Sequence, residues 1–102
     1  MIRLSTMSSV CPDWTLDETL AGMRRHGYTG YEPRVEWGHQ TGIELALTPA
    51  QRKEVKRKFD AEGLSICCLA TGLRFAMPAA AERAQNAAKL REYIGLAGDL
   101  GA

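Results

Sequence analysis

The stretch YEPRVEWGHQ, residues 31–40, gathers two glutamates, an arginine, a tryptophan and a histidine. Glu32 and Arg34 are two positions apart, so in a β-strand both side chains project to the same face. A carboxylate there could move protons, and a guanidinium could bind a phosphate or orient the carboxylate. The alternative is a structural ion pair across the sheet. We take Glu32 as the candidate catalytic residue and Arg34 as a candidate substrate-binding residue.

Three further candidates for substrate binding lie in predicted loops: Trp37, His39 and Arg74. Trp37 could stack on a sugar ring or pack within its loop. His39 could be a metal or substrate ligand, or a surface residue. Arg74 and Phe75 follow the third predicted strand, although Phe75 could simply pack. The residues alone predict no metal site, because the common motifs for metals and phosphates (H-E-x-x-H, G-x-G-x-x-G and a loop ending in Gly-Lys-Ser/Thr) do not occur.

Composition places the 102 residues among globular proteins of one domain or less, with 45% hydrophobic and 25% charged residues. The net charge of +1 gives no bulk attraction to nucleic acid or to a membrane surface. The run RKEVKRKF, residues 52–59, holds five basic residues, but helical spacing around Val55 and Phe59 predicts a solvated outer face. We expect neither nucleic acid nor membrane as a partner.

The three cysteines predict reduced thiols and a cytoplasmic location. Cys67 and Cys68 are adjacent in an apolar run, so in a strand they point to opposite faces and cannot form an ordinary disulfide. A buried strand would keep both thiols inert, with Cys11 a third free thiol. The start MIRLSTMSS has no sustained apolar region, so no signal peptide is expected there.

The chain repeats one plan three times, a strand followed by a helix. The predicted strands are residues 2–7, 29–35 and 64–71. Capping boxes predict helix starts at Thr15 and Thr48. The third helix follows FAMPAAAER, which offers no capping side chain, so we expect it to fray at its start.

Glycines that suit the left-handed turn after a helix recur at 27, 63 and 101, with separations of 36 (63 − 27) and 38 (101 − 63) residues. This predicts an α/β fold of three consecutive βα units, about 1–27, 28–63 and 64–102, with a parallel sheet. One strand face would be polar and would face a barrel interior: Arg3, Ser5, Glu32, Arg34, Ser65 and Cys67. The other would pack on the helices: Ile2, Leu4, Tyr31, Pro33, Val35, Ile66 and Cys68. A small doubly wound, flavodoxin-like sandwich, with one helix on the other face, is the alternative.

Several phrases together resemble the sugar phosphate isomerase/epimerase family over essentially the full length of the chain: HGYTGYEPR, GHQTGIELALTPAQR, AEGLSICCLATGLRF and AERAQNAAKLREYIGLAGDLGA. That family shares the xylose isomerase-like TIM barrel, which also includes apurinic endonuclease-like members. The resemblance implies a barrel of eight βα units and ~250 residues, of which three are present. It also implies interconversion of an aldose and a ketose, or epimerisation beside a carbonyl, on a sugar or sugar phosphate. A divalent metal (Mn, Mg, Co or Zn) would assist.

The family's metal-binding carboxylates and histidines mostly belong to later strands, so the resemblance implies no cofactor and no isomerase activity for this chain alone. We expect an amino-terminal fragment that stops at a unit boundary. The alternative function is a non-catalytic or engineered (βα)3 building block. Three parallel strands with helices on one face leave the other face and two edges open. Both readings therefore predict a homo-oligomer or a complementing barrel fragment.

Overall fold

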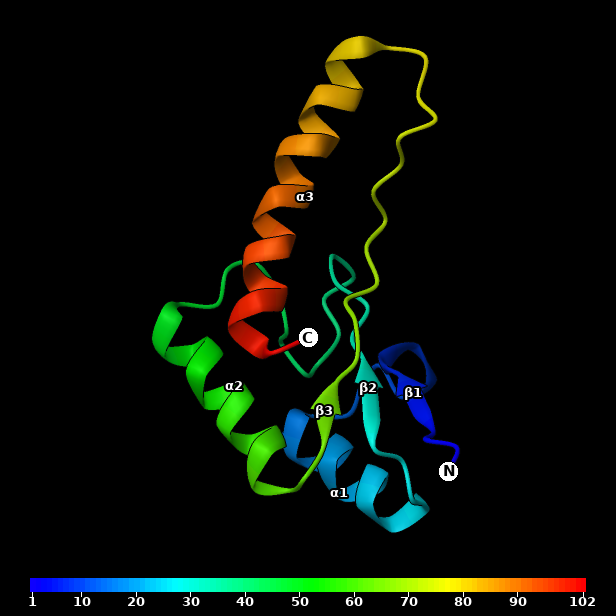
Figure 1. Ribbon diagram of the computed structural model, residues 1–102, viewed down its shortest axis with the longest axis vertical. Coiled ribbons are helices and arrows are strands. Elements are labelled where there is room, and N and C mark those ends of the chain that lie inside the picture. Colours follow the sequence, from blue (N-terminus) through cyan, green and yellow to red (C-terminus); the bar gives the residue numbers. More distant parts are fainter.

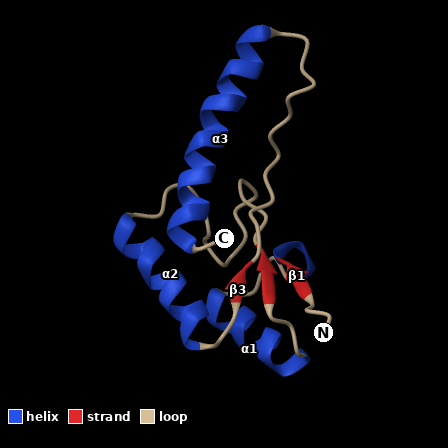
Figure 2. Cartoon of the chain, viewed as in Figure 1, coloured by secondary structure: helices blue, strands red, loops and turns tan.

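The computed structural model describes residues 1–102 as an α/β chain with a three-stranded parallel sheet (Figure 1). The elements, in chain order, are β1 (Ser5–Met7), the 3-10 helix η1 (Ser8–Val10), α1 (Leu16–His26), β2 (Gly30–Glu32), α2 (Pro49–Ala61), β3 (Ser65–Ile66) and α3 (Ala80–Leu100). Helices and strands alternate along the chain, as Figure 2 shows by colour. The predicted α/β class and parallel sheet are confirmed.

The strands are shorter than the apolar runs predicted. Residues 2–4, which were predicted as the start of the first strand, lie before β1 and are not part of it. The Leu4 carbonyl nevertheless accepts from the N–H groups of Thr29 and Gly30. One isolated parallel bridge, Arg34 to Ala70, extends the pairing of β2 with β3. The regular ladder is brief, with three paired positions between β1 and β2 and two between β2 and β3.

The helices share one face of the sheet. Along β2 and the three residues that follow it, Tyr31, Pro33 and Val35 are buried, whereas Glu32 and Arg34 are half-buried on the other face. A single buried cluster joins this face to all three helices. The strand order is β1-β2-β3, with β2 central, whereas the flavodoxin-like order places β1 between β2 and β3. The flavodoxin-like alternative is therefore wrong.

Phe59 of α2 occupies the middle of the core. Its ring centroid lies 5.9 Å from that of Tyr31, at an interplanar angle of 52°. Leu20 and Met23 of α1 and Leu96 of α3 belong to the same buried cluster. These contacts fix how α2 lies against β2, and so where the loop after β2 emerges.

Both predicted capping boxes are confirmed: the Thr15 and Thr48 hydroxyls each accept from the backbone N–H three residues on, and the bonds are returned by Glu18 and Gln51. The missing cap of the third helix is also confirmed, because Ala79 at that position makes no side-chain bond. Instead the Arg83 guanidinium donates to two backbone carbonyls just before the helix. Asn86, one turn further on, donates to the Arg74 carbonyl, so two side chains tie the start of α3 to the preceding segment.

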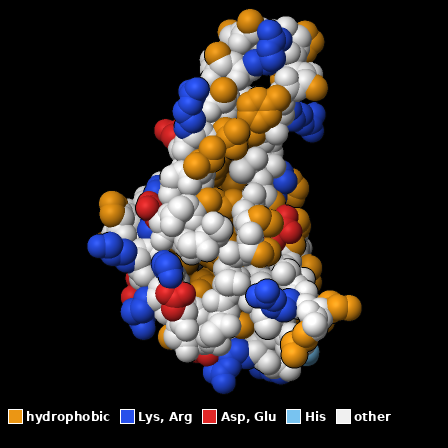
Figure 3. All heavy atoms as spheres, viewed as in Figure 1, with side chains coloured by type: hydrophobic (Ala, Val, Ile, Leu, Met, Phe, Trp, Pro, Cys, Tyr) orange, Lys and Arg blue, Asp and Glu red, His pale blue; other side chains and the backbone are white.

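α3 is much longer than the sheet that it packs on. Its buried residues, Tyr93, Leu96 and Leu100, all lie in its second half. The first half projects from the body beside the segment 69–79 (Figure 1), and hydrophobic side chains line this projection with basic ones around them (Figure 3). None of the three helices combines the length and the apolar character that crossing a bilayer requires.

Two sequence predictions about the first strand are wrong. Ile2 and Leu4 were expected to pack on the helices, yet they are 87% and 53% exposed. Neither residue belongs to the buried cluster, and Leu4 lines a cavity between β1 and α1. The large apolar residues of the β1 edge therefore face solvent.

Cys11, Cys67 and Cys68 are free thiols, as predicted. The expected burial and opposite orientation of Cys67 and Cys68 are wrong, since both are exposed and their Sγ atoms are 4.0 Å apart. Between the pairs Tyr31–Ile66 and Arg34–Ala70, β2 advances by three residues (34 − 31) and the third strand by four (70 − 66). The extra residue breaks the alternation of faces, as in a β-bulge. The two thiols therefore come together instead of pointing apart.

Candidate functional site

The loops that follow the parallel strands meet around Ser8, directly after β1. Its Oγ accepts from the Arg34 backbone N–H at 2.7 Å and lies 2.8 Å from His39 Nδ1. When His39 is neutral with its hydrogen on Nε2, the Ser8 hydroxyl donates to Nδ1, and both bonds are satisfied. Ser8 is only 3% exposed. It ties the loop after β2 to the end of β1.

The Arg34 guanidinium is held by neutral groups. It lies 4.4 Å from the centroid of the Trp37 ring, and its Nη1 donates to the Thr71 carbonyl at 3.3 Å. Its Nε is buried and has no hydrogen-bond partner. None of the six ion pairs in the structure involves Arg34. The carboxyl ends of the strands therefore carry one positive charge without an acidic partner.

Trp37 and His39 lie beside Arg34, as a shared site would require. Their ring centroids are 6.1 Å apart in an edge-to-face arrangement. Trp37 is largely exposed, but the guanidinium covers one face of its indole. Stacking of a sugar on Trp37 must therefore use the other face of the ring.

Glu36 connects this cluster to α3. Its carboxylate accepts from the Tyr93 hydroxyl at 3.0 Å and from Lys89 Nζ at 3.1 Å. Burial raises the pKa of Glu36, but the bonds from Lys89 and Tyr93 outweigh burial and the net pKa lies below its ordinary value. Burial and the Glu36 carboxylate raise the pKa of Tyr93. Glu36 therefore stays a carboxylate and Tyr93 a neutral donor.

The backbone at Glu36 has a positive φ of 75°, which is uncommon outside glycine. In this conformation its N–H donates to both carboxylate oxygens of Glu44 at 3.1 and 2.9 Å. Gly72 lies opposite, and a Cβ there would stand 3.2 Å from both Arg34 Nη2 and Glu36 Oε2. The glycine therefore leaves room for two side chains of opposite charge to approach the same loop.

The lowered pKa of Glu36 predicts an acid-sensitive contribution to stability. A carboxyl whose pKa is lower in the folded state stabilises the fold above its unfolded pKa, and this is lost as the pH falls through the folded value. Glu36→Gln should therefore flatten the fall in unfolding free energy between about pH 6 and pH 3, measured by urea denaturation. Glu92→Gln, at an exposed residue of α3 without an ion pair, is the control. An equally steep profile in Glu36→Gln would contradict the assignment.

Glu32 makes no hydrogen bond or ion pair with Arg34 or with the residues that hold it. It makes none of the ion pairs, so the predicted structural pair across the sheet is not formed. The register places Glu32 beside Met7 on the open face of the sheet. Burial raises the pKa of Cys68 to about 11, with Cys67 and Glu32 adding to the effect. Glu32 therefore belongs to a neighbouring group with the two thiols.

Arg74 is not part of the cluster. It is exposed in the segment that runs to α3, and its carbonyl accepts from the Asn86 side chain at 2.5 Å. Sequence reasoning missed Ser8, Lys89 and Tyr93, which the structure adds to the cluster. Ser8 had a signal, since it directly follows a predicted strand, but Lys89 and Tyr93 come from a helix whose position could not be read from the pattern.

The family's divalent metal does not fit the residues of this chain. No group of three or more histidine, cysteine, aspartate or glutamate side chains is gathered so that it could hold a metal ion. The carboxylates of Glu36 and Glu44 are already engaged by donors within the protein.

Four of the five basic residues of α2 pair with acids: Arg52 with Asp99, Lys56 with Asp60, Arg57 with Glu54, and Lys58 with Asp17. Lys53 and Arg57 are exposed, in agreement with the predicted solvated face. Arg52 departs from that prediction, because its side chain is only 17% exposed and donates to the carbonyls of Leu45 and Leu47.

Comparisons of the chain with protein-family models, curated proteins and solved structures find no match. The isomerase/epimerase resemblance therefore stays a prediction from the quoted motifs. What the structure establishes is the class: a small α/β chain with a parallel sheet and a polar cluster at the carboxyl ends of its strands.

Proposed function

We propose that this chain is the amino-terminal part of a sugar isomerase/epimerase-like barrel, and that the Arg34 cluster binds the anionic or hydroxyl oxygens of a sugar or sugar phosphate. The observation that carries the proposal is the Arg34 guanidinium, which is positively charged, has no acidic partner, and has a buried Nε without a hydrogen-bond partner. Such a group is the preferred partner of a phosphate.

The position of the cluster supports the proposal. Ligands of parallel α/β sheets bind beyond the carboxyl ends of the strands, in the loops that follow them. Here Ser8, Arg34 and Thr71 come from the ends of three successive strands and contact one another. Successive parallel neighbours with helices on one face are also what a barrel requires.

Each residue has a distinct part in this proposal. Arg34 would hold the anionic group, and its place is set by Trp37 and Thr71. His39 Nε2 would donate to a sugar hydroxyl, while Ser8 fixes the ring through Nδ1. Glu32, on the open face, would be the carboxylate that exchanges a proton with substrate once the remaining strands close that face.

The proposal predicts binding without turnover. Fructose 6-phosphate should shift the NMR signals of the Trp37 indole N–H and the His39 amide, and unphosphorylated fructose should bind about tenfold more weakly, since a charge-assisted hydrogen bond is lost. Arg34→Met should remove this preference. Arg74→Met, at an exposed arginine outside the cluster, is the matched control. Isomerase assays of the chain with added divalent metal should show no turnover.

Two results would count against the proposal. Unchanged Trp37 and His39 signals at millimolar fructose 6-phosphate would exclude sugar phosphate binding at the cluster. The same loss of affinity in Arg34→Met and Arg74→Met would show that the phosphate is attracted by charge alone.

The open edges favour a second candidate function, a building block that assembles head to tail. β1 and β3 each have one unpaired edge. Exposed apolar residues flank both: Ile2 and Val10 lie near β1, and Ile94, 61% exposed, lines an apolar hollow of about 260 Å³ beside Cys67 and Cys68. Pairing of β3 of one copy with β1 of the next would cover both edges.

Light scattering at micromolar concentration, with and without divalent metal, tests this assembly. A multiple of the monomer mass that Ile2→Lys reduces to the monomer, and that Gln85→Lys on the projecting part of α3 leaves unchanged, is the expected result. A monomer under all conditions, with sharp two-state unfolding, would contradict it.

A further inference from the structure

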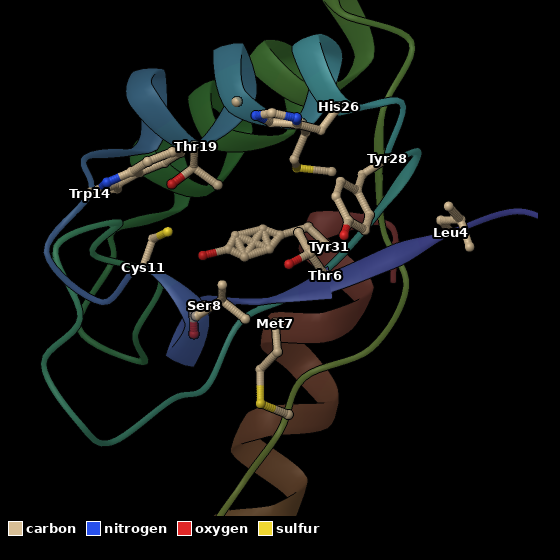
Figure 4. A pocket seen from close by; sticks show the side chains of 13 residues that line it. Leu4, Thr6, Met7, Ser8, Cys11, Trp14, Thr19, His26, Tyr28 and Tyr31 are labelled. Atoms are coloured by element: carbon tan, nitrogen blue, oxygen red, sulfur yellow. The ribbon is translucent and has the colours of Figure 1, made fainter.

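A cavity of about 470 Å³ lies between β1 and α1, on the helix side of the sheet (Figure 4). This volume falls within the range of ligand pockets, ~300–1,000 Å³. Of its 13 lining residues eight are hydrophobic, and none is aspartate, glutamate, lysine or arginine. Leu4, Trp14, Met23 and Tyr28 supply much of the apolar wall. The lining favours an uncharged occupant.

One buried polar group in this wall has no partner. Thr19 is 8% exposed, and its Oγ1 makes no hydrogen bond. Figure 4 shows this hydroxyl turned from α1 toward the β1 side of the cavity, where the Tyr31 ring lies. A buried hydroxyl without a partner costs about 1–3 kcal/mol. A water molecule, or the oxygen of a ligand, would remove that cost.

Two residues on this side of α1 depart from what a stable helix prefers. Thr19 places a hydroxyl at a position that the helical spacing turns toward the sheet, and Gly22 costs about 1 kcal/mol relative to alanine in a helix interior. A Cβ at Gly22 would stand 2.5 Å from the Trp14 ring, so the glycine makes room for that ring. Local departures of this kind cluster at functional sites.

The group nearest to Thr19 across the cavity is also polar. Burial raises the pKa of the Tyr31 hydroxyl, and the hydroxyls of Thr41, Ser8 and Thr19 lie near enough to offset part of the effect, although Thr19 Oγ1 is not within hydrogen-bond geometry of any partner. Ser8 Oγ is already engaged with Arg34 and His39. Thr19 Oγ1 is therefore the group in this wall that an incoming oxygen would satisfy.

We propose that the cavity between β1 and α1 binds a small, uncharged aromatic molecule that carries one hydroxyl or carbonyl group, with Thr19 as its hydrogen-bond partner. The aromatic body packs on Trp14, Met23 and Tyr28, and the single oxygen reaches Thr19. The site lies on the opposite side of the sheet from Glu32 and Cys67. It shares Ser8 with the Arg34 cluster, but Arg34, Trp37 and His39 do not line it.

A pair of probes that differ by one hydroxyl tests the assignment. In NMR titrations 2-naphthol and naphthalene should both shift the amides of Thr19, Gly22 and Tyr28. The wild-type protein should prefer 2-naphthol roughly fivefold, as one hydrogen bond implies. Thr19→Val keeps the shape but lacks the hydroxyl, so it should bind both compounds equally. It should also raise the melting temperature of the free protein.

A second pair of variants tests the cavity itself. Thr6 lines the cavity from β1, so Thr6→Phe should fill it and abolish binding of both probes, while Thr6→Val should retain both. An unchanged preference for 2-naphthol in Thr19→Val would overturn the proposal. So would the absence of binding to a protein whose mass is that of a dimer, because a second copy would then occupy the cavity.

Discussion

Phe59→Ala should lower the free energy of unfolding by a large part of its total. Phe59 is 2% exposed and packs on Tyr31 and the rest of the buried cluster. Removing a buried phenylalanine side chain costs about 3–5 kcal/mol, against a total stability of about 5–15 kcal/mol for an ordinary domain. The melting temperature, measured by circular dichroism, should fall by at least ~12 °C.

Variants on the same helix separate this effect from a general weakening of α2. Phe59→Leu keeps most of the apolar volume and should cost much less than Phe59→Ala. Lys53→Ala, at an exposed position, should change the stability by no more than about 0.5 kcal/mol. A loss below about 1 kcal/mol for Phe59→Ala would mean that α2 does not rest on the sheet as described.

Ser8→Ala should have the second large effect, because it removes one acceptor and one bond to histidine at once. The Arg34 N–H would lose its partner at 2.7 Å, and His39 would lose its contact at 2.8 Å. A donor left unsatisfied away from water costs about 1–3 kcal/mol. Hydrogen exchange of the Arg34 amide should accelerate, and the signals of residues 36–40 should broaden as the loop is released.

The neighbouring residue provides the control. Ser9 is exposed and makes no side-chain hydrogen bond, so Ser9→Ala should leave both the exchange rate and the stability unchanged. If Ser8→Ala and Ser9→Ala behaved alike, the Arg34 loop would be held by the bridge to Ala70 and not by the serine.

Local signals in the sequence predicted the helices well. The capping boxes at Thr15 and Thr48 and the glycines that end the first and third helices act within a few residues, so one turn of chain is enough to recognise them. The polar and apolar faces of β2 also follow from alternation alone. Arg34, Trp37 and His39 were brought together because they share one loop.

What failed depended on parts of the molecule remote in sequence. Ile2 and Leu4 are exposed because no helix of this chain packs closely on the start of β1, which their own pattern does not encode. Cys67 and Cys68 meet through an extra residue that only the pairing with β2 reveals. Arg74 was predicted to join the site because it follows the third strand. In the structure its segment runs along the projecting part of α3 instead, where the Arg74 carbonyl accepts from Asn86.

The unbroken length of α3 has a mechanical consequence. The start of α3 has no buried residue, whereas Lys89 and Tyr93, near the middle of the helix, bind the Glu36 carboxylate. A rigid rod anchored in this way acts as a lever, so a molecule that grasped the tip would transmit its pull to the loop that holds Arg34. A contact at the tip of α3 would then change the position of the loop that holds Arg34, and with it the affinity of the cluster for an anion.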